Sequence, residues 1–126
     1  MAVVLDASAV LAVYLDEPGA ETAEGVMAGS LLSSVNYTEV ISKALDRGRS
    51  FEHVLISLAR MAFIVVAYDL TLARRAGELR LPTRRFGLSV GDRACLALAE
   101  RERLPAYTTD RTWAKLNLGI DIRLIR

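Results

Sequence analysis

The sequence predicts an α/β fold: a single domain built on a mainly parallel, five-stranded sheet flanked by helices. Short apolar segments alternate with segments of helical periodicity from one end of the chain to the other. Strands separated by helices imply right-handed crossovers, which place the strands parallel and cover the sheet on both faces. The length of 126 residues suits one domain spanning residues 1–126, and a hydrophobic content of 52% supplies its core without a disulfide or a structural metal.

Five apolar segments are predicted to be strands. The run Phe-Ile-Val-Val-Ala-Tyr at residues 63–68 has the clearest strand pattern in the sequence. In chain order, the predicted strands are residues 2–5, 31–34, 63–68, 106–108 and 122–125.

Helices are predicted between these strands. Val10, Leu11 and Tyr14 fall on one helical face directly after the first strand. Pro18 is suited to the first position of a second helix, which we expect to run to about Met27. The other predicted helices are residues 36–45, 51–60, 70–79 and 89–103, and residues 82–87 are predicted to be a loop.

Four acidic residues are predicted to gather at one edge of this sheet. Asp6 ends the first predicted strand, and Glu39 lies in the first turn of the helix that follows the second. Asp92 opens the helix that leads into the fourth strand, and Asp110 follows that strand by two residues. Because ligands of parallel sheets bind beyond the carboxyl ends of the strands, where the strand order reverses, we expect the four carboxylates to share one crevice.

Such a cluster of carboxylates favours a divalent metal ion. Like charges a few ångströms apart in a partly desolvated site repel one another, and some of the acids would have to stay protonated. A hard cation removes this repulsion, and carboxylate and water oxygens are ligands that suit Mg²⁺ or Mn²⁺. Such ions polarise phosphate esters and lower the pKa of bound water, so the predicted chemistry is hydrolysis of a phosphodiester bond without a histidine.

Each acid also has an ordinary structural explanation. Asp6 is placed to cap the helix after it, and the tetrapeptides 36–39 and 89–92 resemble capping boxes. Asp110 is placed to begin an Asx turn. Capping accounts for each position separately, but it does not account for the placement of all four acids beside strand ends.

The same residues carry a resemblance to a known family. Four segments resemble, in order, the four motifs of the PIN-domain nucleases: VLDASAVL at 4–11, VNYTEV at 35–40, LSVGDRACLALA at 88–99 and TTDRTW at 108–113. Their order and spacing, and the size of the chain, are similar to those of the VapC-type ribonuclease toxins of bacterial and archaeal toxin–antitoxin pairs. The resemblance covers essentially the whole chain.

This resemblance implies a metal-dependent endoribonuclease that uses Mg²⁺ or Mn²⁺, is held inactive by a cognate, VapB-like antitoxin and forms a homodimer. It assigns the four acids to the acidic, metal-binding cluster of the family. Ser8 and Thr109 match small hydroxyl residues beside that cluster, which hydrogen-bond a carboxylate or a bound water.

The basic residues are unevenly distributed. The formal net charge of +1 neither favours nor opposes a nucleic-acid partner, but residues 74–85 contain five arginines and one glutamate, a local charge of +4. Arg84, Arg85 and Arg93 are candidates for a contact with RNA or with a protein partner. A solvated helix face followed by a loop is the plainer interpretation of this segment.

Several single residues limit the function further. A lone cysteine, Cys95, excludes an internal disulfide and fits a reducing cytoplasm, and its apolar neighbours indicate a buried hydrophobe. His53 is interpreted as a surface residue, and Tyr107 and Trp113 are expected to pack beneath the last strand rather than to stack a base. The apolar runs are short, so neither a membrane-spanning helix nor a secretory leader is expected.

Two other functions compete with the nuclease hypothesis. An aspartyl-phosphate-type phosphatase also has an acid at the end of its first strand, but it needs a second acid at the position of Ser8. A phosphorylation-dependent, receiver-like signalling module needs paired acids there and a phosphoacceptor after the third strand, where Asp69 follows residues 63–68. The acid pair is missing from this chain. Neither of the common glycine-rich nucleotide-binding motifs occurs.

Overall fold

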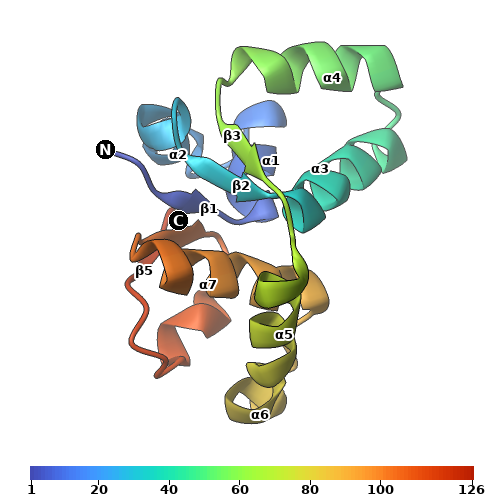
Figure 1. The fold of residues 1–126 in the computed structure, drawn as a ribbon. Helices are drawn as coiled ribbons and strands as arrows, with labels where there is room; N and C mark the ends of the chain where they lie inside the picture. The colour runs from blue at the N-terminus through green and yellow to red at the C-terminus, as the bar shows by residue number, and fades with distance from the viewer.

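A five-stranded sheet, in which every neighbouring pair of strands is parallel, forms the centre of the molecule. The computed structural model describes residues 1–126. The strands are β1 (Val4–Leu5), β2 (Leu31–Ser33), β3 (Ile64–Val66), β4 (Ala106–Thr108) and β5 (Ile122–Leu124). Their order across the sheet is β3-β2-β1-β4-β5 (Figure 1). The predicted α/β class and the five parallel strands are confirmed.

Helices cover both faces of this sheet. They are α1 (Ala7–Tyr14), α2 (Ala20–Met27), α3 (Ser34–Asp46), α4 (Phe51–Arg60), α5 (Leu70–Glu78), α6 (Arg80–Thr83) and α7 (Val90–Glu102), with the 3-10 turns η1 (Arg84–Phe86) and η2 (Arg111–Lys115). Helices α1 to α4 pack on one face, above the sheet in Figure 1, and α5, α7 and η2 pack on the other. The pleat of β1 explains how one strand serves both cores, because Val4 points into one apolar cluster and Leu5 into the other.

The strand order reverses at β1. From β1 the chain moves outward through β2 to β3, and it then returns to build β4 and β5 on the opposite side. Val4 pairs with Ala106, and the Asp6 amide donates to the Tyr107 carbonyl at 2.9 Å. The carboxyl ends of β1 and β4 are therefore the switch point at which parallel sheets bind ligands. This order also differs from the 2-1-3-4-5 order of receiver-like folds, which removes the structural basis of the receiver alternative.

Two helices begin at residues other than those predicted, for local reasons. Helix α2 begins at Ala20 rather than at Pro18, because Gly19 adopts a left-handed conformation (φ 95°) that ends the preceding turn. Helix α3 begins at Ser34 rather than at residue 36, because the Ser33 hydroxyl accepts a hydrogen bond from the Val35 amide at 3.3 Å. The predicted loop at residues 82–87 is wrong as well, since α6 and η1 fill most of it.

Strand β3 is shorter and more exposed than its sequence suggests. Only residues 64–66 of the predicted 63–68 are in the ladder, and the strand lies at the edge of the sheet. Ile64 is 52% exposed and Val65 is 42% exposed. No helix is long and apolar enough to cross a membrane.

Candidate active site

Asp6 lies at the switch point, in the position where α1 is capped, but its carboxylate does not cap the helix. Its backbone is extended (φ −75°, ψ 157°), and no hydrogen bond joins its side chain to the first turn of α1. Instead, Oδ2 of Asp6 accepts hydrogen bonds from the Ser8 hydroxyl at 2.8 Å and from the Thr108 hydroxyl at 2.9 Å. The capping interpretation of Asp6 is therefore wrong.

The negative charge of Asp6 is strongly disfavoured in this position. The side chain is buried, with 6% of the residue exposed. Burial is the main cause that raises the pKa of Asp6 from 3.8 to about 6; the two hydroxyl donors lower it, and the charges of Asp92 and Glu39 raise it further. A bound cation would offset both the burial and the repulsion.

Asn36 fixes the orientation of Glu39. The Asn36 side chain is fully buried, and its Nδ2 donates to Oε1 of Glu39 at 2.8 Å and to the Gly91 carbonyl at 3.0 Å. Because α3 begins at Ser34, Asn36 lies within the first turns of the helix and is not a cap, so the capping box predicted for residues 36–39 is wrong. The Asn36 amide instead links α3 to the start of α7. Its own Oδ1 is buried without a partner.

Gly91 makes room for the Glu39 carboxylate. A Cβ at residue 91 would lie 2.6 Å from Cδ of Glu39 and would overlap its Oε1. The helical glycine therefore allows α3 and α7 to approach with the acid between them.

Asp92 has the capping role that the sequence suggested. Its Oδ2 accepts a hydrogen bond from the Ser89 amide at 2.9 Å, and the Ser89 hydroxyl accepts one from the Asp92 amide at 3.1 Å. This confirms the capping box at residues 89–92. The charge of Asp92 nevertheless acts on the Asp6 carboxyl, so the cap also holds a second acid beside the switch point.

Asp110 is exposed, and its carboxylate begins the turn that follows β4. Its Oδ1 accepts a hydrogen bond from the Thr112 amide at 2.9 Å, which confirms the Asx-turn interpretation. The Asp110 amide donates to the Thr108 hydroxyl at 3.1 Å, the same hydroxyl that donates to Asp6. Asp110 is thus joined to the site through Thr108, whereas the charges that act on Asp6 are those of Asp92 and Glu39.

The hydroxyl groups around Asp6 differ in part from those expected. Ser8 donates to Asp6 as predicted, but Thr109 contributes its backbone amide, which donates to the Ser8 hydroxyl at 3.0 Å. The second hydroxyl on Asp6 belongs to Thr108, which the sequence analysis did not select. The signal that could have identified Thr108 was its position at the end of a predicted strand, one residue before Thr109.

The four carboxylates are ligands of the kind that suits a divalent cation. Each of the four acids accepts protein hydrogen bonds at only one carboxylate oxygen, so Oδ1 of Asp6, Oε2 of Glu39, Oδ1 of Asp92 and Oδ2 of Asp110 remain without donors. No three His, Cys, Asp or Glu side chains lie close enough together in this structure to hold an ion. To bind one, the carboxylates would have to turn their free oxygens toward a common point.

The buried aromatic and sulfur side chains near the site are part of the core. Trp113 is fully buried and Tyr107 is 8% exposed, so both are core residues, on opposite faces of the sheet; Trp113 shares its cluster with Ile122 of the last strand. Cys95 is fully buried, and the pKa of its thiol is raised well above the ordinary value, mainly by burial and further by the neighbouring carboxylates. These groups do not face a substrate.

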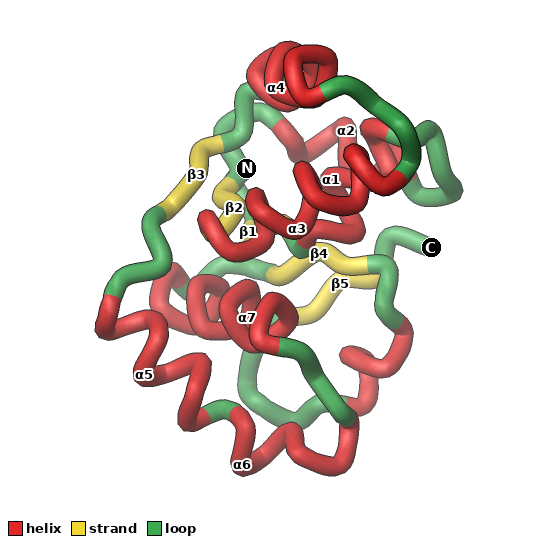
Figure 2. Tube along the Cα trace, turned by 90° about the vertical axis from the view of Figure 1, so that its right-hand side faces the viewer, coloured by secondary structure: helices red, strands yellow, loops and turns green.

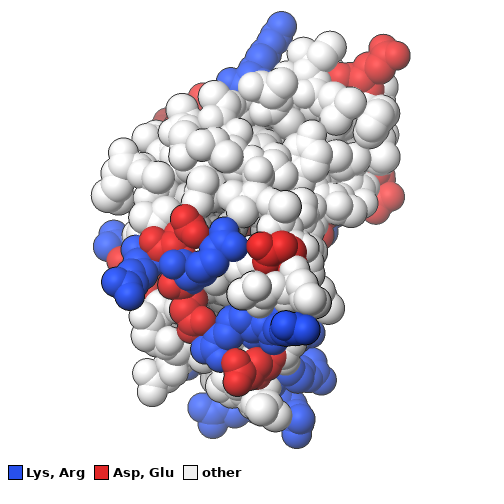
Figure 3. Space-filling model, in the orientation of Figure 1, with Lys and Arg blue, Asp and Glu red and all other residues white.

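The three candidate arginines lie on η1 and α7, in the part of the chain that packs with α5 on one face of the sheet. Arg93 is half-buried, and its Nη1 donates to the Ala76 carbonyl at 3.0 Å, so its side chain is directed at α5. Arg84 and Arg85 are exposed on η1, and Arg85 lies over the Phe86 ring at 4.8 Å. Figure 3 shows charged side chains gathered over the lower half of the molecule, where α5 to α7 lie, and a mostly uncharged surface above them, with a few charged side chains at its upper edge.

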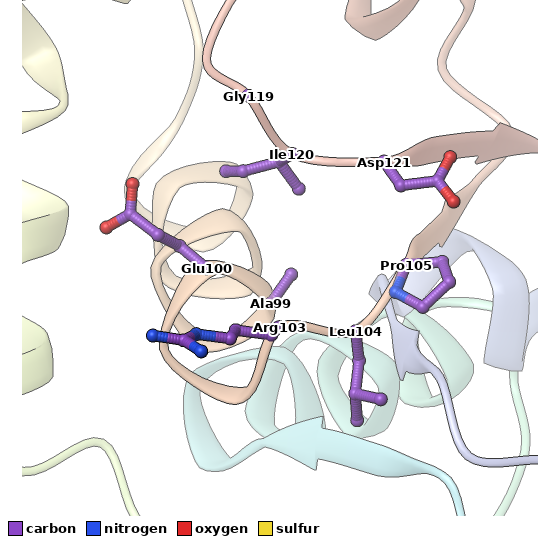
Figure 4. A pocket seen from close by; sticks show the side chains of 8 residues that line it. All are labelled: Ala99, Glu100, Arg103, Leu104, Pro105, Gly119, Ile120 and Asp121. Carbon is purple, nitrogen blue, oxygen red and sulfur yellow. The ribbon is translucent and has the colours of Figure 1, made fainter.

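A hollow of about 260 Å³ lies at the opposite edge of the sheet (Figure 4). It is lined by the segment between α7 and β4 and by the residues before β5, including Arg103, Pro105 and Asp121. These are the amino-terminal ends of the strands, where parallel sheets do not place their ligand sites. The carboxyl ends, which Figure 2 views with α3 and α7 on opposite sides of β4, carry the candidate site.

Comparisons with known proteins relate the whole chain to one family. Residues 3–118 match the model of the PIN domain. No curated protein matches the chain. Among solved structures, a chain of the toxin–antitoxin complex from Klebsiella pneumoniae superposes with a TM-score of 0.76 at 20% identity, covering 100% of this chain and 98% of that one. A chain of the DNA-bound VapBC from Salmonella typhimurium superposes with a TM-score of 0.76 at 19% identity, covering 100% of this chain and 99% of that one.

A third solved structure, VapBC2 from Rickettsia felis bound to a DNA fragment from their promoter, gives a TM-score of 0.73 at 15% identity and covers 98% of each chain. At these identities the three likenesses establish the fold.

Proposed function

This chain belongs to the PIN-domain family, whose members are nucleases, and on that premise we propose that it is a metal-dependent endoribonuclease, the toxin of a toxin–antitoxin pair. The observation that carries the proposal is the group of three acids at the switch point. Asp6 is buried there next to the charges of Glu39 and Asp92, and a cation bound among these carboxylates would offset both the burial and the repulsion that raise its pKa.

In this proposal Asp6, Glu39, Asp92 and Asp110 hold Mg²⁺ or Mn²⁺ through their free oxygens. When bound, such an ion polarises the scissile phosphate and lowers the pKa of a water molecule. The protein supplies position: Ser8 and Thr108 hold one oxygen of Asp6 and leave the other free, and Asn36 does the same for Glu39. The capping box fixes Asp92 at the start of α7.

A protein partner is part of the same proposal. The structures that resemble this chain include a toxin–antitoxin complex and two VapBC complexes, which supports a VapB-like antitoxin as the partner. The proposal of RNA as the substrate rests on the four sequence motifs. We further propose that the active form is a homodimer. Arg84 and Arg85 remain candidates for a contact with RNA or the antitoxin, since both are exposed.

The test is cleavage of single-stranded RNA in Mg²⁺ or Mn²⁺ by the wild type and by Asp6→Asn and Asp92→Asn. Both variants are expected to lose cleavage while circular dichroism shows an intact fold, and EDTA is expected to abolish wild-type cleavage. Asp69→Asn is the matched control, because Asp69 caps α5 by accepting from the Leu72 amide at 3.0 Å, away from the site.

The control is expected to cleave at the wild-type rate. If Asp6→Asn and Asp92→Asn also cleave at that rate, the four acids have structural roles only, and the proposal is wrong.

A further inference from the structure

A polar groove of about 350 Å³ begins at the candidate active site and runs along α3. One end is lined by Ser8 and Thr109, the residues that support Asp6. The rest of its lining includes three cationic side chains, Lys43, Arg47 and Arg126, and two carboxylates, Glu17 and Asp46. The groove therefore carries a net positive charge beside the residues that support Asp6.

The spacing along α3 places this charge in line with the site. Glu39, Lys43 and Arg47 follow one another at four-residue intervals, which puts them on one face of the helix, about 6 Å apart along its axis. Glu39 lies against Gly91 at the candidate site, and Lys43 and Arg47 follow at increasing distance from it along the helix.

The charges of Lys43 and Arg47 are available to a ligand. Both residues are exposed, and neither forms an ion pair with a carboxylate, in contrast to Arg75 on α5, which binds Glu78 and Glu100 at 2.6 Å. In the same groove, Arg126 lies 3.7 Å from Glu17 and so offsets one of the acidic groups of the lining.

A simpler role accounts for only part of this arrangement. Lys43 and Arg47 lie at the carboxyl end of α3, where cations interact favourably with the helix dipole. That interaction does not require a hollow that runs from these residues to Ser8 and Thr109, nor alignment with Glu39.

We propose that this groove binds the sugar–phosphate backbone of the RNA strand on one side of the scissile bond, with Lys43 and Arg47 each contacting a phosphate. The proposal rests on the nuclease function above. A basic groove that follows the backbone is the common means of binding single-stranded nucleic acid without sequence preference. Contacts of this kind position the strand and do not select bases.

The test is the salt dependence of binding to a short, fluorescein-labelled, single-stranded RNA of mixed sequence, measured in EDTA so that no cleavage occurs. Each phosphate contact to a single strand contributes about 0.7 to the slope of log K against log salt concentration. Lys43→Gln/Arg47→Gln is therefore expected to reduce the slope by about 1.4. In Mn²⁺ the same variant is expected to raise KM for cleavage and to keep kcat.

Two controls make the result specific. Arg74→Gln/Arg80→Gln removes two exposed arginines from α5 and α6, on the other face of the sheet, and is expected to keep the wild-type slope. Lys43→Arg/Arg47→Lys retains both charges and is expected to keep it as well.

An unchanged slope and KM in Lys43→Gln/Arg47→Gln, with wild-type cleavage intact, would overturn the groove and leave the nuclease function standing. Wild-type protein that neither cleaves nor binds this RNA would overturn both. If the double variant binds RNA normally but loses affinity for an acidic peptide, the groove serves a protein and the proposal is wrong.

Discussion

Where a side chain at residue 91 would extend, the carboxylate of Glu39 is found instead. The Asn36 amide holds this carboxylate against the start of α7, so a Cβ at position 91 would require the Glu39 carboxylate to move. A glycine in the first turn of a helix usually lowers helix stability, which makes its role here the accommodation of an acid.

The variant Gly91→Ala tests whether the position of Glu39 matters for cleavage. The new Cβ is expected to displace Glu39 and to lower RNA cleavage by at least an order of magnitude, because the displaced carboxylate cannot hold the metal ion. Gly77→Ala in α5 is the matched control: a Cβ there meets no atom within 4 Å, so it should stabilise the protein by about 0.5–1 kcal/mol and keep full cleavage. Equal cleavage rates in the two variants would show that Glu39 has no role in catalysis.

At the same scale, the sequence identified acids more readily than their supports. Asp6, Glu39 and Asp92 were found because their positions relative to strands and helix starts depend on local pattern alone. Thr108 was missed in favour of Thr109, because the choice depends on how β4 aligns with β1, and the periodicity of a short strand does not determine that register.

Among the secondary-structure elements, α7 combines a capping function with part of the candidate site. The capping box satisfies the amides of its first turn and, by the same hydrogen bonds, fixes the Asp92 side chain. The cap and the metal ligand are therefore not competing explanations of this residue.

Ser89→Ala tests this double role without altering the acid. Loss of the hydroxyl that accepts from the Asp92 amide is expected to lower the free energy of unfolding by about 1 kcal/mol. Cleavage at saturating Mn²⁺ should be largely retained, since the carboxylate remains. Urea denaturation and initial rates measure the two effects, and a loss of cleavage as large as that of Asp92→Asn would mean that the cap itself is needed for activity.

The elements also show where local pattern is sufficient. The prediction of α4 as residues 51–60 is confirmed to the residue, because Ser50 caps it and its apolar face is regular. The predicted loop at 82–87 failed, since Pro82 and Gly87 are typical of loops but Pro82 lies within the short helix α6. Strand β3 was overestimated because apolar content does not distinguish a central strand from an exposed edge.

For the whole molecule, the raised pKa of Asp6 links folding to pH. Its value of about 6 in the folded protein lies above the ordinary value of 3.8, so the folded state binds this proton more tightly than the unfolded state. Keeping Asp6 ionised therefore costs about 3 kcal/mol at pH values above 6, and this cost is relieved as the pH falls towards 4.

We expect metal-free Asp6→Asn to be more stable than the wild type at neutral pH, with a difference that shrinks between about pH 6 and pH 4. The hydroxyl groups of Ser8 and Thr108, which donate to Asp6 in the wild type, can donate to the amide oxygen of the new asparagine. Thermal unfolding in EDTA measures this difference. A difference that does not change with pH would contradict the raised pKa.

Adding Mg²⁺ at neutral pH should remove most of this difference in stability. An ion at 100 times its Kd stabilises the wild type by about 2.7 kcal/mol, whereas Asp6→Asn should gain little.

The pairing of β1 with β4 has a consequence for biosynthesis. Asp6 leaves the ribosome about a hundred residues before the strand beside it and the Thr108 hydroxyl that donates to it. A nascent chain that has not reached β4 cannot assemble the proposed nuclease centre. The topology thus delays assembly of the proposed centre until β4 has been made, and a ribosome that has not yet synthesised β4 carries a nascent chain without that centre.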